Sequence, residues 1–145
     1  MLHRNAALLG AVAFLCLLLQ FSAIAVAQTK SGSTFVAYYW RAKPGQEQAY
    51  SEYIRTIAEP IDEDARRAGA FEEVRTVTPA PGITTDWTHL RIFRLKDAAA
   101  ADALGAALDA ATARIVPDET RRKANSDRSA SLRDFVRREV WTELR

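Results

Sequence analysis

Residues 86–95 of the chain read Asp-Trp-Thr-His-Leu-Arg-Ile-Phe-Arg-Leu, and this stretch has the cleanest alternation in the sequence. A period of two predicts a β-strand whose two faces differ. One face has the aliphatic pair Leu90 and Ile92 at its centre, and the other presents Trp87, His89, Arg91, Phe93 and Leu95. We expect the aliphatic centre to face the core, which leaves the face that carries His89 free of helices.

Two more strands are predicted upstream of this stretch, at Thr34–Arg41 and Phe71–Pro79, because both are rich in β-branched or aromatic residues. The sequence Pro79-Ala80-Pro81-Gly82 predicts the turn that follows the second of them. The apolar side chains of the first strand fall on both of its faces, with Phe35, Ala37 and Tyr39 on one and Val36, Tyr38 and Trp40 on the other. We therefore expect both faces of this strand to be covered.

Helical spacing of apolar residues follows the first strand from Gln46 to Ala68. Pro60 interrupts this spacing and predicts a kink near residues 57–59, and Gly69 predicts the end of the helix. A second helix is expected over Ala98–Ile115 behind the N-cap Asp97, and a charged helical piece from Pro117 towards Ser131.

A closing strand is predicted at Phe135–Leu144. The order strand, helix, strand, strand, helices, strand is the split βαββαβ arrangement of ferredoxin-like α+β domains. We therefore expect a four-stranded antiparallel sheet with helices on one face. The other face is rich in aromatic residues, and an exposed patch of this kind predicts a partner, most simply a second copy that makes a homodimer through the sheets.

The layout resembles the dimeric α/β-barrel superfamily over roughly residues 35–144. The resemblance rests on Lys-Pro-Gly-Gln-Glu at 43–47 before a tyrosine-bearing helix, on Pro60 within that helix and on Val-Trp-Thr-Glu-Leu at 140–144. It includes a distant similarity to antibiotic-biosynthesis monooxygenase-like domains. It implies that two sheets enclose a shared cavity, and exported members of unknown function also belong to this superfamily.

The N-terminus, Met1–Ala27, has the pattern of a cleavable signal peptide: a basic start, an apolar core from Ala6 and an Ala-Val-Ala exit. An uncleaved membrane anchor is the alternative reading. Residues 28–33 form a polar tether, and 34–145 form one domain. We expect an exported protein, periplasmic or secreted, with no membrane contact after cleavage. Cys16 lies inside the signal, so no disulfide holds the domain.

His89 is the one histidine left after cleavage, and we place it with Arg91 as the candidate catalytic pair. His89 has the residue type of a general base or an axial haem ligand, and Arg91 that of a clamp for a carboxylate or enolate. The competing interpretation is structural, with His89 wedged inert in an interface and Arg91 in an ion pair, for instance with Glu73.

Tyr39, Trp87 and Phe93 are the candidate ligand-binding residues, because aromatic side chains often line pockets for flat apolar molecules. Ordinary packing of these rings is the competing interpretation. The net charge of +2 does not favour nucleic acid, and no metal-ligand spacing or phosphate loop occurs. We predict no cofactor and no metal.

Two functions remain open from the sequence. The first is an exported dimeric domain that binds a small hydrophobic or aromatic ligand in the cavity between its subunits. The alternative is a cofactor-free enzyme of the monooxygenase or isomerase type that uses His89 and Arg91.

Overall fold

The computed structural model describes residues 32–144, so the predicted signal peptide and most of the tether lie outside the described residues. Four strands form one antiparallel sheet in the order β2-β3-β1-β4. The elements are β1 (Thr34–Ala42), α1 (Glu47–Tyr53), the π-helical turn η1 (Ile54–Ala58), α2 (Glu59–Arg67), β2 (Glu73–Val77), β3 (His89–Leu95), α3 (Ala98–Ile115), α4 (Glu119–Leu132) and β4 (Arg133–Thr142).

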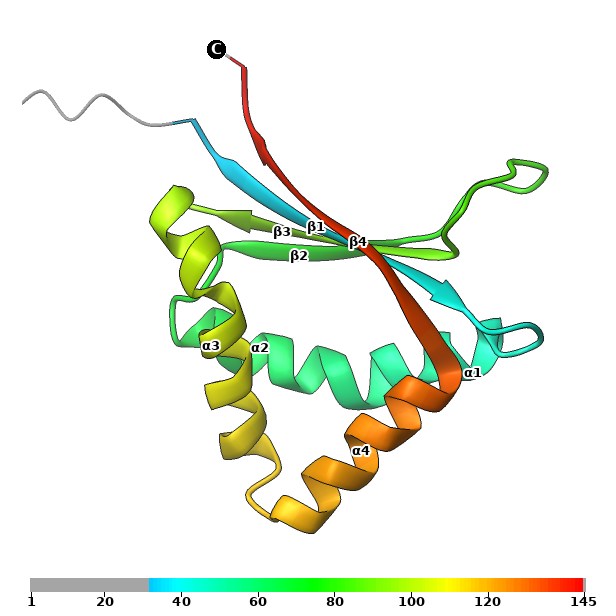
Figure 1. The fold of residues 1–145 in the computed structure, drawn as a ribbon. Helices are drawn as coiled ribbons and strands as arrows, with labels where there is room; N and C mark the ends of the chain where they lie inside the picture. Colours follow the sequence, from blue (N-terminus) through cyan, green and yellow to red (C-terminus); the bar gives the residue numbers. More distant parts are fainter. Residues whose placement is uncertain (1–31, 145) are drawn as a thin grey trace, which may run out of the picture.

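The helices all lie on one face of the sheet, as Figure 1 shows. The run α1–η1–α2 crosses beneath the strands, and α3 and α4 descend from the sheet and meet at their far ends (Figure 1). The predicted α+β, ferredoxin-like class is confirmed. No helix among residues 32–144 is long and apolar enough to cross a membrane.

Local signals set the helix ends where the sequence predicts them. The Asp97 side chain accepts a hydrogen bond of 2.8 Å from the Ala100 N–H and caps α3, and Asp118 caps α4 in the same way. The expected kink before Pro60 is the turn η1, after which Pro60 lies in the first turn of α2. A proline has no N–H to donate to the helix. Pro60 is therefore accommodated most easily just after η1, where the hydrogen-bond pattern changes from π-helical to α-helical.

The main core lies between the sheet and the helices α2 and α3. Its largest fully buried side chains include Val36 of β1, Phe93 and Leu95 of β3, and Leu104 of α3. A second cluster, around Tyr50 and Leu132, fills the space between α1, α4 and the end of β1. Both clusters are on the helix side of the sheet.

The predicted orientation of β3 is wrong. Phe93 and Leu95 lie in the helix-side core, and His89, on the same side, contacts α1. Leu90 and Ile92 lie on the uncovered face instead. The prediction assumed that His89 and Arg91 would avoid the helices, but α1 and α2 supply polar partners for both. When both faces of a strand are apolar, the polar partners on the helices decide which face packs against them. An error in this choice places every side chain of the strand on the wrong side of the sheet.

The uncovered face of the sheet keeps an apolar centre. Ala37, Tyr39 and Leu90 are buried there, and Trp87 and Ile92 lie against them half-buried. Arg137 of β4 lies 3.8 Å above the ring of Tyr39, whose hydroxyl donates to Glu139 over 3.0 Å. Charged side chains of β4 therefore cover part of this face.

Candidate functional site

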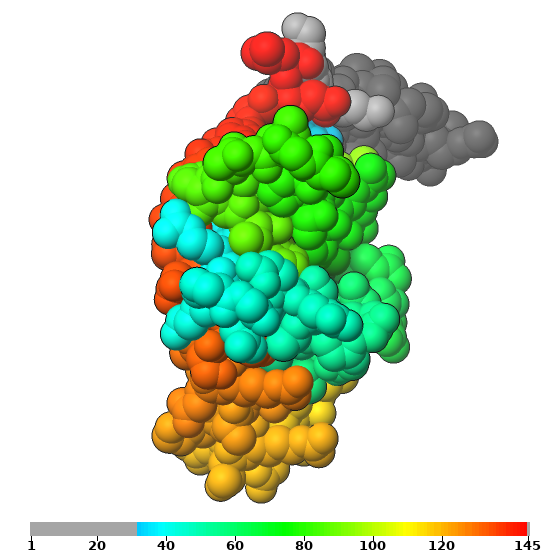
Figure 2. Space-filling model, turned by 90° about the vertical axis from the view of Figure 1, so that its right-hand side faces the viewer, coloured from blue at the N-terminus to red at the C-terminus, as the bar shows by residue number. Residues whose placement is uncertain are grey.

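A cleft separates α1 and η1 from β2, from the start of β3 and from the segment that joins these two strands. The segment, residues 78–88, lies directly above α1 in the space-filling view of Figure 2, where it is green and α1 is cyan. Two adjoining cavities make up the cleft, with volumes of about 370 Å³ and 480 Å³. Their linings share Ser51, Thr78 and His89, so these residues lie where the two cavities meet.

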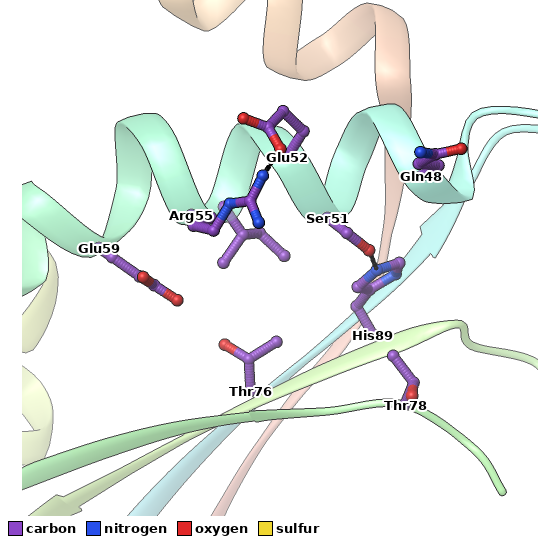
Figure 3. A pocket seen from close by; sticks show the side chains of 9 residues that line it. Gln48, Ser51, Glu52, Arg55, Glu59, Thr76, Thr78 and His89 are labelled. Atoms are coloured by element: carbon purple, nitrogen blue, oxygen red, sulfur yellow. Dashed lines mark hydrogen bonds and ion pairs between the residues drawn. The ribbon is translucent and has the colours of Figure 1, made fainter.

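His89 forms the floor of the cleft and is only 2% exposed. Its Nε2 lies 2.9 Å from the Ser51 hydroxyl oxygen, and its Nδ1 lies 2.9 Å from that of Thr88. The ring of Tyr50 meets the imidazole edge-on at 4.6 Å between centroids. Figure 3 shows Ser51 pointing from α1 down to the imidazole. Both ring nitrogens therefore have hydroxyl partners.

The surrounding hydrogen bonds assign the proton of His89 to Nε2. Ser51 already donates to the Glu47 carbonyl over 2.9 Å, so its oxygen accepts from Nε2. Thr88 accepts from the Ala42 N–H over 2.7 Å and donates its own proton to Nδ1. The opposite tautomer would leave Thr88 only a contact of 3.4 Å to a backbone carbonyl. With Nε2 as a donor and Nδ1 as an acceptor, both hydrogen bonds fit a neutral imidazole.

Burial lowers the pKa of His89 below its ordinary value, because the charged form loses solvation; the nearby Glu47 opposes this only in part. The neutral ring can accept a proton or a hydrogen bond at Nδ1 and donate one at Nε2. Because Ser51 and Thr88 occupy both nitrogens, one of these hydroxyls must turn away before the imidazole can bind a ligand or accept a proton from it.

Arg91 lies two residues after His89 in β3, and its side chain is therefore on the same face of the sheet. It makes an ion pair with Asp62 of α2, and the two side chains are 13% and 5% exposed. The expected pair with Glu73 is wrong, because Glu73 is on the opposite face of the sheet and pairs with Arg75 and Arg94. Burial raises the pKa of the Asp62 carboxyl, and Arg91 opposes this shift. The charge of Arg91 is thus balanced within the protein.

A third cavity, of about 330 Å³, lies beside this ion pair and shares Glu59 and Thr76 with the 370 Å³ cavity. Arg91 borders this third cavity and His89 does not. The Nε of Arg91 is buried without a hydrogen-bond partner. The two predicted catalytic residues therefore share a face and lie in neighbouring compartments.

The three predicted ligand-binding residues are separated by the fold. Trp87 borders the 480 Å³ cavity together with Ile83 and His89. Tyr39 lies beyond it on the uncovered face of the sheet, with its ring 5.8 Å from that of Trp87. Phe93 is 1% exposed in the core, so the prediction that it lines a ligand site is wrong.

Sequence reasoning missed Ser51, Thr88 and Asp62. Asp62 had a usable signal, because it stands between Ile61 and Ala65 on the apolar stripe of a helix, where an acid needs a buried partner. Ser51 and Thr88 had none, because a hydroxyl fits equally well in a helix surface or a strand end. No group of acids, histidines or cysteines among residues 32–144 is arranged to hold a metal ion.

Comparisons with known proteins place the fold and no function. No protein-family model matches the sequence, and no curated protein does either. The crystal structure of HapK from Hahella chejuensis is similar with a TM-score of 0.52 and 12% identity, over 77% of this chain and 92% of HapK. At this identity the likeness shows the fold alone.

A second solved structure, an ethyl tert-butyl ether D (EthD) family protein from Bacillus halodurans, has a TM-score of 0.43 and 13% identity, over 78% of this chain and 99% of that protein. A TM-score at this level is too low to assign a common fold. Neither likeness indicates what this chain binds or catalyses.

Proposed function

We propose that the domain binds a small organic molecule with an apolar or aromatic body in the cleft between α1–η1 and segment 78–88. The observation that carries the proposal is His89, a buried neutral imidazole placed where two adjoining cavities meet. Ile83, Pro79 and Trp87 supply an apolar wall on one side of it. Ligand sites typically combine such a wall with a few convergent polar groups.

A matched pair of variants tests this proposal. Ile83 is 61% exposed at the cleft, and Ile115 is 44% exposed at the end of α3. We expect Ile83→Ser to weaken binding of naphthylmethanol, measured by calorimetry, by roughly five- to tenfold, because part of an isoleucine's burial energy is lost. Ile115→Ser should bind as the wild type does. Equal affinity in both variants would contradict the proposed site.

The enzyme alternative is favoured by one observation, which is that the acceptor nitrogen of His89, Nδ1, is held by the hydroxyl of Thr88, and both residues border the 480 Å³ cavity. This Nδ1 can take a proton from an acidic C–H of a ligand once Thr88 rotates towards the Trp40 carbonyl. Arg91 is a poor clamp for the resulting anion, because Asp62 already balances it. Deuterium uptake from heavy water by a bound C–H acid, lost in His89→Gln, would support this alternative; no uptake above the solvent rate would remove it.

We further propose that two copies pair through their uncovered sheet faces, as in the dimeric α/β-barrel superfamily that the sequence resembles, and that the protein is exported. Val77 and Trp141 are 39% and 40% exposed on this face, beside half-buried Phe35 and Ile92. Export predicts that the protein found outside the cytoplasm begins near Gln28, which N-terminal sequencing checks. Material that retains Met1 would contradict cleavage.

A further inference from the structure

The charged side chains that line the cleft are mostly acidic. The two cavities that meet at His89 are lined by three acidic side chains and one basic side chain, namely Glu47, Glu52, Glu59 and Arg55. The whole chain carries a formal charge of +2, so this excess of acids is a local property of the cleft.

The cations in and beside the cleft already have partners. Arg55 makes an ion pair with Glu52 one turn earlier in the helix. In the neighbouring cavity Arg91 pairs with Asp62, and both Nε and a terminal nitrogen of Arg66 donate to Glu63 over 2.9 Å. Among the described residues, the side chains of Glu47 and Glu59 make no ion pair and no hydrogen bond. Two unbalanced carboxylates therefore remain, one towards each end of the cleft.

The positions of these carboxylates suit a ligand that lies along the cleft. Glu47 borders the cavity that Trp87 and Ile83 line, and Glu59 borders the other cavity. Figure 3 shows Glu59 extending from α2 into the space above Thr76. Trp87 lines the same cavity as Glu47 and supplies apolar surface beside its carboxylate. An anion would find no cation here without first breaking an ion pair.

We propose that the cleft selects organic cations, that is, amines with an aromatic or apolar body, over neutral and anionic molecules of the same shape. The inference rests on the proposed function, because it names the class of ligand that the same cleft takes. The aromatic body lies against Trp87 and Ile83, and the ammonium group lies near Glu47, which borders the same cavity. The carboxylate of Glu59, in the adjoining cavity, attracts the cation over a longer distance. Burial of the ligand's ring supplies the affinity, and the two carboxylates make the cleft prefer a positively charged ligand.

Three probes of one shape test this selection in the whole protein at pH 7.5: naphthylmethylamine, naphthylmethanol and naphthoate. We expect the amine to bind about fivefold or more tighter than the alcohol, and naphthoate to bind more weakly than either. The preference for the amine over the alcohol should shrink between about 20 mM and about 500 mM NaCl, because salt screens charges at an exposed cleft.

Matched variants connect the preference to the two carboxylates. Glu59→Gln and Glu47→Gln should each reduce the preference for the amine and leave the affinity for the alcohol within about twofold, since only the charge is removed. Glu119→Gln, at the exposed start of α4, is the control and should change neither affinity.

The outcomes separate this inference from the proposed function. Binding of the alcohol with no preference for the amine, or with naphthoate as tight as the amine, overturns the charge selection and leaves the ligand cleft standing. A preference that survives in the Glu47→Gln, Glu59→Gln double variant also overturns it. No saturable binding of any probe overturns both.

Discussion

His89 is held neutral by burial and by two hydroxyl partners, so the stability of the domain depends on pH. Its pKa is lower in the folded state than in the unfolded chain, and the unfolded chain therefore takes up a proton first as the pH falls. The stability that the neutral ring contributes is complete above the unfolded pKa of about 6.5 and is lost as the pH falls from there towards the lower folded pKa.

The test compares urea unfolding of the wild type and His89→Gln at pH 7.5 and pH 5. The wild type should lose more free energy of unfolding across this interval than the variant does, because glutamine does not titrate. Equal losses would show that His89 is not held neutral. Carboxyl groups that titrate near pH 5 affect both proteins, so the difference between the two isolates the histidine.

Asp62 and Arg91 form the most buried ion pair described between residues 32 and 144. We expect Asp62→Ala to lower the free energy of unfolding by about 3–5 kcal/mol, because it leaves the charge of Arg91 buried and unpaired. Asp64→Ala breaks the ion pair between Asp64 and Arg114, which is more exposed than the pair of Asp62 and Arg91. This change should lower the free energy of unfolding by about 1 kcal/mol or less. The double change Asp62→Leu, Arg91→Met should recover much of the loss. An equal cost for the two single aspartate changes would refute this ranking.

At the scale of elements, α3 depends on its first turn. Asp97→Ala removes the side-chain acceptor for the Ala100 N–H and should cost about 1 kcal/mol of unfolding free energy, measured with urea. Asp102→Ala, on an exposed part of the same helix, should stay within about 0.5 kcal/mol. A similar cost for both would mean that helix propensity, and not the cap, sets the stability of α3.

The elements themselves could be predicted because each carries a local signal. The run Ala98–Ile115 behind Asp97 is found as predicted, and Pro60 marks the interruption at η1. The sequence predicts the position of β3 along the chain correctly but assigns its two faces the wrong way round. Alternation shows that the two faces of the strand differ, but it does not show which face is buried. One face carries Leu90 and Ile92, the other carries Phe93 and Leu95, and each face is apolar enough to be buried.

The same limit applies to the candidate site. His89 is a candidate from the sequence because it is the only histidine in the predicted domain, and its catalytic role stays a prediction. Its partners Ser51 and Thr88 come from α1 and from segment 78–88, and only the folded chain brings them together. The sequence therefore predicts that His89 faces a cavity between two subunits, whereas His89 borders a cleft on the helix side of the sheet.

At the scale of the whole molecule, the uncovered sheet face predicts self-association. We expect the wild type to sediment as a dimer and Ile92→Lys to raise the dimer Kd about tenfold or more, because a charge would be placed among apolar side chains at the contact. Ile115→Lys, on α3 and away from that face, should leave the dimer intact. A monomeric wild type at high protein concentration would contradict the pairing.

Binding of a ligand in the cleft on the helix side is tested most directly by mapping the ligand with amide chemical shifts. Naphthylmethanol titrated into the isotope-labelled protein should produce saturable shifts centred on Ser51, Thr78, Trp87 and His89, which border the two cavities. Saturable shifts centred on Phe35, Ile92 and Trp141, on the opposite face of the sheet, would contradict it.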